Sequence, residues 1–203
     1  MITLYHAPQS RSSRIIWFLE ELQQPYEIRP VSIFRPMTGE GSPDAANPHP
    51  DKRVPVVVHD GAVLAESIAI FLYLTDAFPD AGLGPDAGNK ARGDYLTWLT
   101  WYAAEMEPAM FLSFGNELDV PMKKRRYDAA VQRIEQALAN GPYMLGDRFT
   151  SIDLIVASAL DFGRKAFPPS AAIDAYIERC KTRPACVRAI ALDSASGVQR
   201  LAA

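Results

Sequence analysis

The sequence predicts an α/β domain over residues 1–79 and an all-helical domain over residues 89–203. The first prediction rests on strand-like and helix-like segments that alternate before the linker. The second rests on apolar residues that recur at helical spacing through most of the remaining chain. Between the two domains, residues 80–88 are dense in glycine, proline and aspartate, which is typical of a linker.

The first domain is expected to open with a strand, a helix and a second strand. Residues 2–5 form a short apolar strand, and residues 25–31 form the second strand. Residues 12–23 place four apolar side chains on one helix face: Ile15, Ile16, Leu19 and Leu22. Residues 34–50 hold four prolines and two glycines, so this stretch is predicted to be an irregular loop.

A hairpin and a helix complete this domain. Val56–Val58 and Ala62–Ala65 are short apolar runs joined through Asp60-Gly61, which favours a type I′ turn with positive φ at both central residues. Pro55 opens the first strand, where its missing N–H costs no ladder bond. Glu66-Ser67 then begin a helix to residue 78, and such a helix start offers unpaired N–H groups to an anion.

The second domain is expected to consist of helices. Residues 90–116 carry an apolar and aromatic stripe at helical spacing, and Pro108 is expected to bend this helix. A further helix spans residues 121–139 and ends at a glycine and a proline. Thr150 and Asp153 fit a capping box before a helix that is apolar nearly all round, which indicates the centre of a domain.

Composition excludes several classes of protein. The chain has 203 residues, 48% of them hydrophobic, and a net charge of −3, which argues against nucleic-acid binding. No apolar run reaches the length of a membrane span, and the first residues carry no signal-peptide pattern. These patterns predict a cytoplasmic protein with no membrane partner.

The cysteines and histidines predict neither a structural disulfide nor a metal site. Cys180 and Cys186 lack C-x-x-C spacing. His6, His49 and His59 are scattered without ligand-like spacing to carboxylates or cysteines.

The hairpin carries a specific motif. V-P-x-V begins at Val54, Asp60-Gly61 follows, and L-x-E-S-x-A-I begins at Leu64. This arrangement resembles the glutathione site of the glutathione S-transferase family, in its cytosolic, bacterial-type members with a serine-type active site. The resemblance implies a thioredoxin-like first domain, a cis proline at position 55, and glutathione as co-substrate without a metal. It also implies a homodimer and a role in detoxification.

Carried over residue by residue, the resemblance assigns five residues to glutathione binding. Val54 and Pro55 orient the backbone of the tripeptide, Glu66 faces its ammonium group, and Ser67 with its own N–H faces the γ-glutamyl carboxylate. Arg53 stands where the family often has a basic residue for the glycyl carboxylate, and Lys52 is the alternative.

Glutathione chemistry needs the thiolate, because the thiol itself is a poor nucleophile. The loop after the first strand offers three hydroxyl groups beside a helix start, and alignment with the serine-type transferases places Ser10 at the activating position. Ser12 and Ser13 fit equally well as helix caps, and they remain alternatives together with Tyr5. The first domain contains no cysteine, which argues against the cysteine-type members that reduce mixed disulfides.

The electrophile pocket is expected between the domains, with Tyr102, Glu105 and Met106 as candidates. Aromatic and methionine side chains at helical spacing more often pack in a core or form a dimer contact than line a substrate pocket. The expected reaction is transfer of the glutathione thiolate to a small hydrophobic electrophile. The alternatives are a glutathione-dependent isomerase, dehalogenase or ether-cleaving lyase on the same fold, or a non-catalytic glutathione-binding relative.

Overall fold

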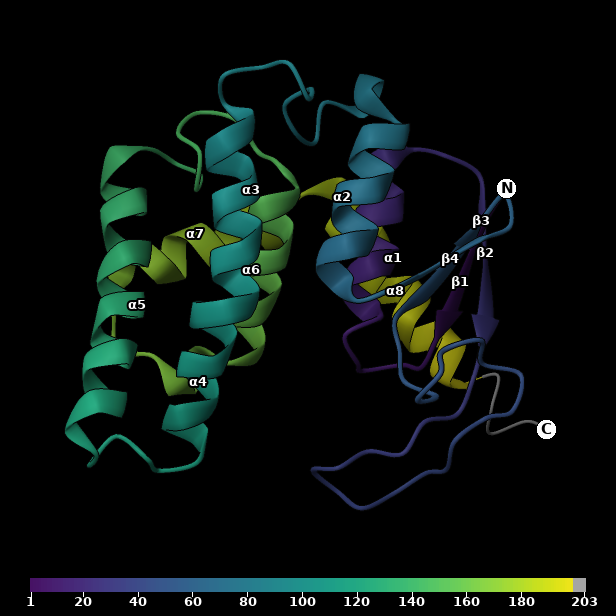
Figure 1. The fold of residues 1–203 in the computed structure, drawn as a ribbon, viewed down its shortest axis with the longest axis horizontal. Helices are drawn as coiled ribbons and strands as arrows, with labels where there is room; N and C mark the ends of the chain where they lie inside the picture. The colour runs from purple at the N-terminus through teal and green to yellow at the C-terminus, as the bar shows by residue number, and fades with distance from the viewer. Residues whose placement is uncertain (199–203) are drawn as a thin grey trace. The chain divides into compact units, whose positions relative to one another are not determined.

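The computed structural model describes residues 1–198 of the chain, which form two compact units (Figure 1). One unit joins Met1–Ala81 to the segment that begins at Pro184, and the other comprises Gly82–Arg183. The division differs from the expected one at the C-terminal end, because the last helix belongs to the first unit.

The first unit is built on a mixed four-stranded sheet with the order β2-β1-β3-β4. β1 (Ile2–His6) pairs in parallel with β2 (Tyr26–Pro30) and antiparallel with β3 (Val56–His59). β3 continues through a turn into β4 (Ala62–Ala65), and Asp60 and Gly61 in this turn have φ of 48° and 87°. The predicted hairpin and its turn are confirmed.

Three helices accompany this sheet: α1 (Ser13–Leu22), α2 (Ser67–Ala77) and α8 (Pro184–Val198). A 3-10 turn at Pro79–Ala81 follows α2. The segment predicted as an irregular loop contains no helix or strand and holds one isolated bridge, between Arg35 and Glu40. The order of elements and the sheet are those of the predicted thioredoxin-like domain.

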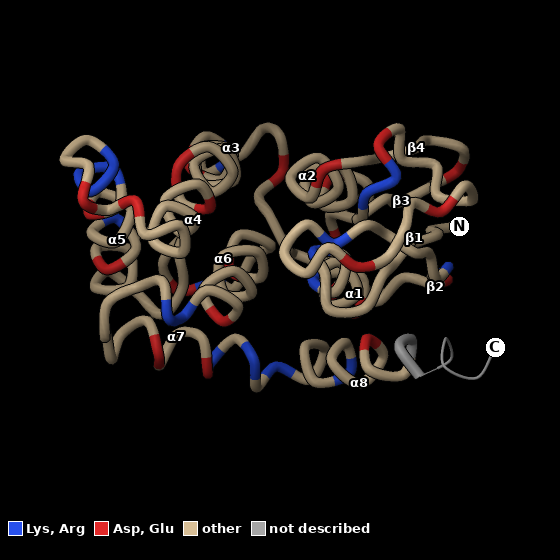
Figure 2. Tube along the Cα trace, turned by 90° about the horizontal axis from the view of Figure 1, so that it is seen from below, with Lys and Arg blue, Asp and Glu red and all other residues tan. Residues whose placement is uncertain are grey.

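Helix α8 packs against α1, and both Figure 1 and Figure 2 show the two helices next to each other. The buried residues of α1 include an unbroken run from Ile15 to Leu19, which covers more than one face of a helix. Such a helix needs apolar cover on the side away from the sheet. Ala185, Cys186 and Ala189 of α8 are buried and have small side chains, which allow two helices to approach closely.

The second unit is helical, as predicted. Its elements are α3 (Arg92–Trp101), a π-helical segment (Tyr102–Met106), α4 (Glu107–Phe114), α5 (Pro121–Asn140), α6 (Ser151–Phe162), a 3-10 turn (Arg164–Ala166) and α7 (Ala171–Lys181). The capping box of Thr150 and Asp153 is present at the start of α6, and most of this helix is buried.

The helix predicted over residues 90–116 is irregular next to Pro108. Proline has no N–H to donate to the carbonyl of Ala104, four residues earlier. The π-helical segment lies at this place, and Arg126 of α5 donates its Nη2–H to the Ala104 oxygen at 2.7 Å. Where a bend was expected from Pro108, the structure has a π-helical turn, and the Ala104 carbonyl that Pro108 leaves without its N–H has a side-chain donor.

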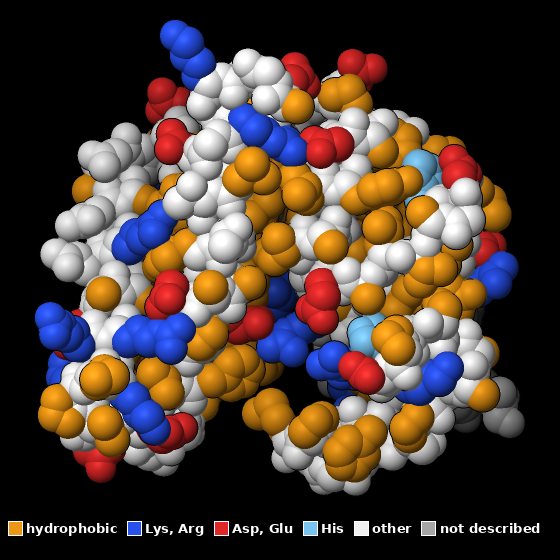
Figure 3. All heavy atoms as spheres, in the orientation of Figure 1, with side chains coloured by type: hydrophobic (Ala, Val, Ile, Leu, Met, Phe, Trp, Pro, Cys, Tyr) orange, Lys and Arg blue, Asp and Glu red, His pale blue; other side chains and the backbone are white. Residues whose placement is uncertain are grey.

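Charged side chains are mixed on the face shown in Figure 3, where basic and acidic groups alternate instead of forming one large patch of a single sign. Among the described helices, none combines the length and the apolar character needed to cross a membrane.

Candidate functional site

The loop between β1 and α1 presents Ser10 at the start of α1. The chain reverses at Gln9, whose φ is 53°, and the Ser10 carbonyl accepts the N–H of Ser13 at 3.0 Å. The Ser10 hydroxyl donates to the carbonyl of Ala7 at 2.7 Å and accepts the N–H of Ser12 at 3.1 Å. Ser10 is half-buried, so part of this residue is accessible to solvent.

The other two hydroxyls of this loop are committed to the fold. Ser12 is fully buried, and its Oγ accepts the N–H of Ala7 at 3.2 Å and lies 2.8 Å from His6 Nδ1. Ser13 donates its hydroxyl proton to the carboxylate of Asp193 at 2.6 Å. Neither side chain caps α1. Of the three serines, Ser10 alone combines partial exposure with a proton held by an uncharged acceptor.

Tyr5, the remaining alternative, points away from this loop. Side chains alternate along a strand, so Tyr5 lies on the sheet face opposite Leu4 and His6. Its hydroxyl accepts a long hydrogen bond of 3.5 Å from Arg29 of the neighbouring strand. The geometry therefore favours Ser10 over Tyr5 as a group near the start of α1.

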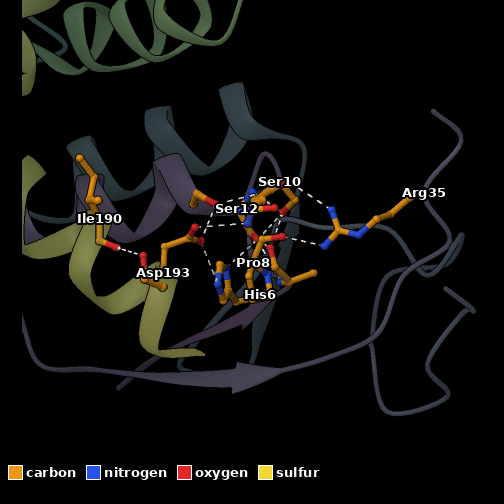
Figure 4. Close-up of polar contacts among 11 residues, drawn as sticks. His6, Pro8, Ser10, Ser12, Arg35, Ile190 and Asp193 are labelled. Carbon is orange, nitrogen blue, oxygen red and sulfur yellow. Dashed lines mark hydrogen bonds and ion pairs between the residues drawn. The ribbon is translucent and has the colours of Figure 1, made fainter. Parts of the chain in front are cut away.

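The loop is held from both sides by side chains distant in sequence (Figure 4). Arg35 donates to the carbonyls of Pro8, at 2.6 Å, and Gln9, at 3.2 Å. Asp193 of α8 accepts the N–H of Gln9 at 3.2 Å, as well as the Ser13 hydroxyl. Burial raises the pKa of the Asp193 carboxyl, but the nearby His6 imidazole and the hydrogen bonds from the Ser13 hydroxyl and the Gln9 amide outweigh it and leave the pKa below its ordinary value.

The peptide bond between Val54 and Pro55 is cis, as the resemblance implies. Val54 lies just before β3, so its backbone N–H and carbonyl are not part of the sheet ladder. The buried amide of Asn47 donates to the Arg53 carbonyl at 3.0 Å and stabilises the backbone just before the cis peptide bond. The Val54 edge is therefore free to pair with an extended peptide.

Glu66 and Ser67 stand at the N-terminus of α2. Glu66 is exposed and has φ of 68° and ψ of 127°, a conformation that is rare for a residue with a side chain and is often found at functional sites. Among the described residues, neither side chain has a hydrogen-bond or ionic partner. The first N–H groups of α2 also lack acceptors within the helix. This helix start combines an unpaired carboxylate, an unpaired hydroxyl and free amides.

Lys52 and Arg53 have different surroundings. Lys52 Nζ donates to the carbonyl of Asn47 at 2.8 Å and to that of Ala45 at 3.4 Å, so its ammonium group stabilises the preceding loop. Arg53 is 65% exposed and forms a surface ion pair of 2.7 Å with Asp51. A surface pair of this kind exchanges readily for another anion. Arg53 is thus the more available cation of the two.

Comparison with known proteins identifies the family. Residues 4–84 match the family model for the glutathione S-transferase N-terminal domain. The chain is 26% identical over 209 residues to glutathione S-transferase 3 of Schizosaccharomyces pombe, which covers 92% of this chain and 85% of that protein. A glutathione transferase crystal structure from Methylococcus capsulatus has a TM-score of 0.78 at 28% identity, covering 96% of this chain and 99% of that one. Residues 4–84 are thus a glutathione S-transferase N-terminal domain, and the relative and the structure that match the chain over most of its length carry the same family name.

The relatives of this chain include one with a different named activity. Maleylacetoacetate isomerase of Rattus norvegicus is 26% identical over 138 residues, which cover 65% of this chain and 63% of that protein. Within the part of the chain that the structure describes, no group of three or more His, Cys, Asp or Glu side chains could hold a metal ion.

The three residues predicted for the electrophile pocket lie in the π-helical segment of the second unit. Tyr102 and Met106 are buried, and the Tyr102 hydroxyl donates to Glu107 at 2.9 Å. Glu105 is half-buried and forms an ion pair of 2.7 Å with Arg126. Burial of the first two side chains favours a role in the core of this helical unit.

Sequence reasoning missed three residues that shape the candidate site: Arg35, Asn47 and Asp193. Asn47 stands before Pro48 in the irregular loop, and an asparagine there could have indicated a turn-stabilising amide. For Arg35 and Asp193 no local pattern exists, because their partners lie 26 to 184 residues away.

Proposed function

We propose that this chain is a glutathione transferase that binds glutathione in its first unit and transfers the thiolate to a small hydrophobic electrophile. The observation that carries the proposal is the unpartnered pair of Glu66 and Ser67 at the start of α2, after a hairpin that opens with a cis proline. A carboxylate and a hydroxyl with free amides match the ammonium and the carboxylate of the γ-glutamyl group.

The remaining contacts follow along the tripeptide. The backbone of Val54 pairs with the cysteinyl part, since its N–H and carbonyl are outside the sheet. Arg53 faces the glycyl carboxylate. In this arrangement the Ser10 hydroxyl donates a hydrogen bond to the glutathione sulfur and stabilises the thiolate.

Simple energetics support Ser10 as the activating group. A free thiol with a pKa of about 8.5 must be stabilised as the anion by roughly 2.7 kcal/mol to be mostly ionised at neutral pH. A hydroxyl donor to a charged acceptor supplies about 1.5–3 kcal/mol, and a helix N-terminus adds up to about 1 kcal/mol. The Ser10 proton needs only to turn from the Ala7 carbonyl to the sulfur, while the Ser12 N–H keeps the Ser10 oxygen in place.

Two variants separate ionisation from binding. Ser10→Ala is expected to raise the pKa of bound glutathione and to lower kcat with chlorodinitrobenzene by about tenfold or more, with little change in Kd. Ser67→Ala is expected to weaken glutathione binding, which calorimetry measures. It should leave unchanged the pH midpoint at which the ultraviolet thiolate band of bound glutathione appears. Wild-type turnover in the Ser10→Ala protein would refute the role of Ser10.

A glutathione-dependent isomerase is the second candidate, because a maleylacetoacetate isomerase is among the relatives. The two reactions differ in stoichiometry: a transferase consumes one glutathione per product, whereas an isomerase returns it unchanged. Following free thiol during turnover distinguishes them. Binding without turnover of any electrophile would instead indicate a non-catalytic relative.

The quaternary structure is part of the proposal. We propose a homodimer, as is typical of the family, and light scattering of the purified protein measures it directly. A monomer at micromolar concentration would contradict this assignment.

A further inference from the structure

One carboxylate from α8 contacts the Ser10 loop at three places. Asp193 accepts the Gln9 N–H at 3.2 Å and the Ser13 hydroxyl at 2.6 Å. Its Oδ1 also lies 3.2 Å from His6 Nε2, a close electrostatic contact without the alignment of a full hydrogen bond. The Asp193 side chain is 17% exposed, so solvent screens these contacts only partly.

Each of the three contacts leads to Ser10. Gln9 precedes Ser10 and carries the left-handed φ of 53° that turns the loop. Ser13 Oγ accepts the N–H of Ser10 at 3.2 Å. His6 Nδ1 lies 2.8 Å from Ser12 Oγ, which lies 2.8 Å from Ser10 Oγ. Figure 4 shows His6, Ser10, Ser12 and Asp193 close together between the end of β1 and α8.

The order Ser12, His6, Asp193 is that of a serine hydrolase triad, but the geometry excludes this activity. Ser12 and His6 are both 0% exposed, so no ester or amide carbon can reach the Ser12 oxygen. The contacts among Ser12, His6 and Asp193 can therefore affect only the conformation of the loop between β1 and α1.

We infer that Asp193 is a positioning residue that fixes the backbone and the hydroxyl of Ser10 for donation to the glutathione sulfur. This inference rests on the proposed function and extends it to a residue of the last helix. The carboxylate holds the amide of Gln9 directly and the amide of Ser10 through Ser13. It does not contact the residues assigned to glutathione binding, so its loss affects ionisation of the thiol more than affinity.

The test compares Asp193→Asn with a control variant that weakens the contact between α8 and α1 at a place outside the Ser10 loop. Asp193→Asn keeps the size of the side chain but removes the charge and one pair of acceptor sites. Arg188→Gln breaks the 2.5 Å ion pair between α8 and Glu20 of α1, which lies outside the Ser10 loop. Both purified proteins are titrated with glutathione by calorimetry, and the pH midpoint of the bound thiolate band and the kcat with chlorodinitrobenzene are measured.

For Asp193→Asn we expect a kcat about tenfold lower and a thiolate midpoint about one pH unit higher. The Kd for glutathione should stay within about twofold, and Arg188→Gln should leave all three quantities within about twofold of wild type. Amide exchange of the segment around Gln9 should accelerate in Asp193→Asn alone. Ser13→Ala, which removes one of the three contacts, should move kcat and the thiolate midpoint in the same direction by a smaller amount.

Two results would overturn the inference. One is a folded Asp193→Asn protein with a wild-type thiolate midpoint, kcat and amide exchange. The other is a loss of kcat and of glutathione affinity that is as large in Arg188→Gln as in Asp193→Asn. That result would indicate that Asp193 only helps to pack α8 against α1. If Asp193→Asn does not fold, an unchanged thiolate midpoint in Ser13→Ala has the same meaning. Failure of the wild-type protein to bind glutathione is a separate result, which overturns the proposed function as well.

Discussion

The buried carboxylate of Asp153 provides a stringent test of what stabilises the helical unit. Asp153 is 0% exposed. Its Oδ1 accepts the N–H of Met144 at 2.8 Å and the hydroxyl of Tyr176 at 3.1 Å. Its Oδ2 accepts the N–H of Thr150 at 2.8 Å and the hydroxyl of Thr150 at 3.2 Å. Both oxygens are therefore acceptors for donors inside the unit.

Asp153→Asn replaces one of these oxygens with an NH₂ group, which cannot accept. Whichever way the amide is turned, one backbone N–H and one hydroxyl lose their acceptor. A buried N–H without an acceptor costs about 1–3 kcal/mol, and the hydroxyl can turn elsewhere at a smaller cost. We expect a loss of about 3 kcal/mol, or a Tm lower by roughly 6–12 °C for a chain of this size.

Thermal and urea unfolding measure this loss, with Tyr176→Phe as the control. The control removes one hydroxyl donor and keeps the carboxylate, so it should cost about 1 kcal/mol. A Tm for Asp153→Asn within about 2 °C of wild type would refute the reasoning, because the carboxylate would then not stabilise the start of α6. An equal loss in both variants would assign the effect to the hydrogen bond from the Tyr176 hydroxyl and not to the backbone N–H groups that the carboxylate accepts.

The remaining predictions concern binding, acid stability and the loop. Arg53→Gln should weaken glutathione binding about threefold by calorimetry, whereas Lys52→Gln should chiefly lower the Tm; equal effects on Kd would contradict this assignment. The pKa of Asp193 is depressed on folding, so its stabilisation is present above the unfolded pKa and is lost as pH falls through the folded one. The Tm difference between wild type and Asp193→Asn should therefore narrow below about pH 4, and a constant difference would count against it. Gly41 has φ of 79°, and an added Cβ would overlap the carbonyl of Ile33, so Gly41→Ala should cost about 1–3 kcal/mol in urea unfolding.

Local patterns predicted those parts of the fold that local physics determines. The Asp60-Gly61 turn follows from the φ values that such a hairpin requires, and both residues have them. The capping box of Thr150 and Asp153 follows from spacing alone, because its partners are three residues apart. The position of the interruption near Pro108 was also predictable, since it follows from a missing N–H.

Contacts between distant segments could not be read from the sequence. The run from Ile15 to Leu19 shows that α1 is covered on more than one side, but no pattern says which element covers it. Helix α8 does so, and its small buried residues resemble those of any packed helix. For the same reason the sequence placed Ser10 at the activating position only through the resemblance and left Ser12 and Ser13 as alternatives. Their different burial depends on His6 and Asp193, which meet only in the folded chain.

The return of α8 to α1 affects the order in which the protein can mature. Gln9 leaves the ribosome 184 residues before the carboxylate that holds its amide. Until then, the apolar side of α1 that α8 will cover has no native partner, and a nascent chain with such a surface is a target for chaperones. A fragment that stops before Pro184 would contain every residue assigned to glutathione and still lack the closing helix of that unit. Synthesis through α8 thus precedes assembly of the candidate site near the start of the chain.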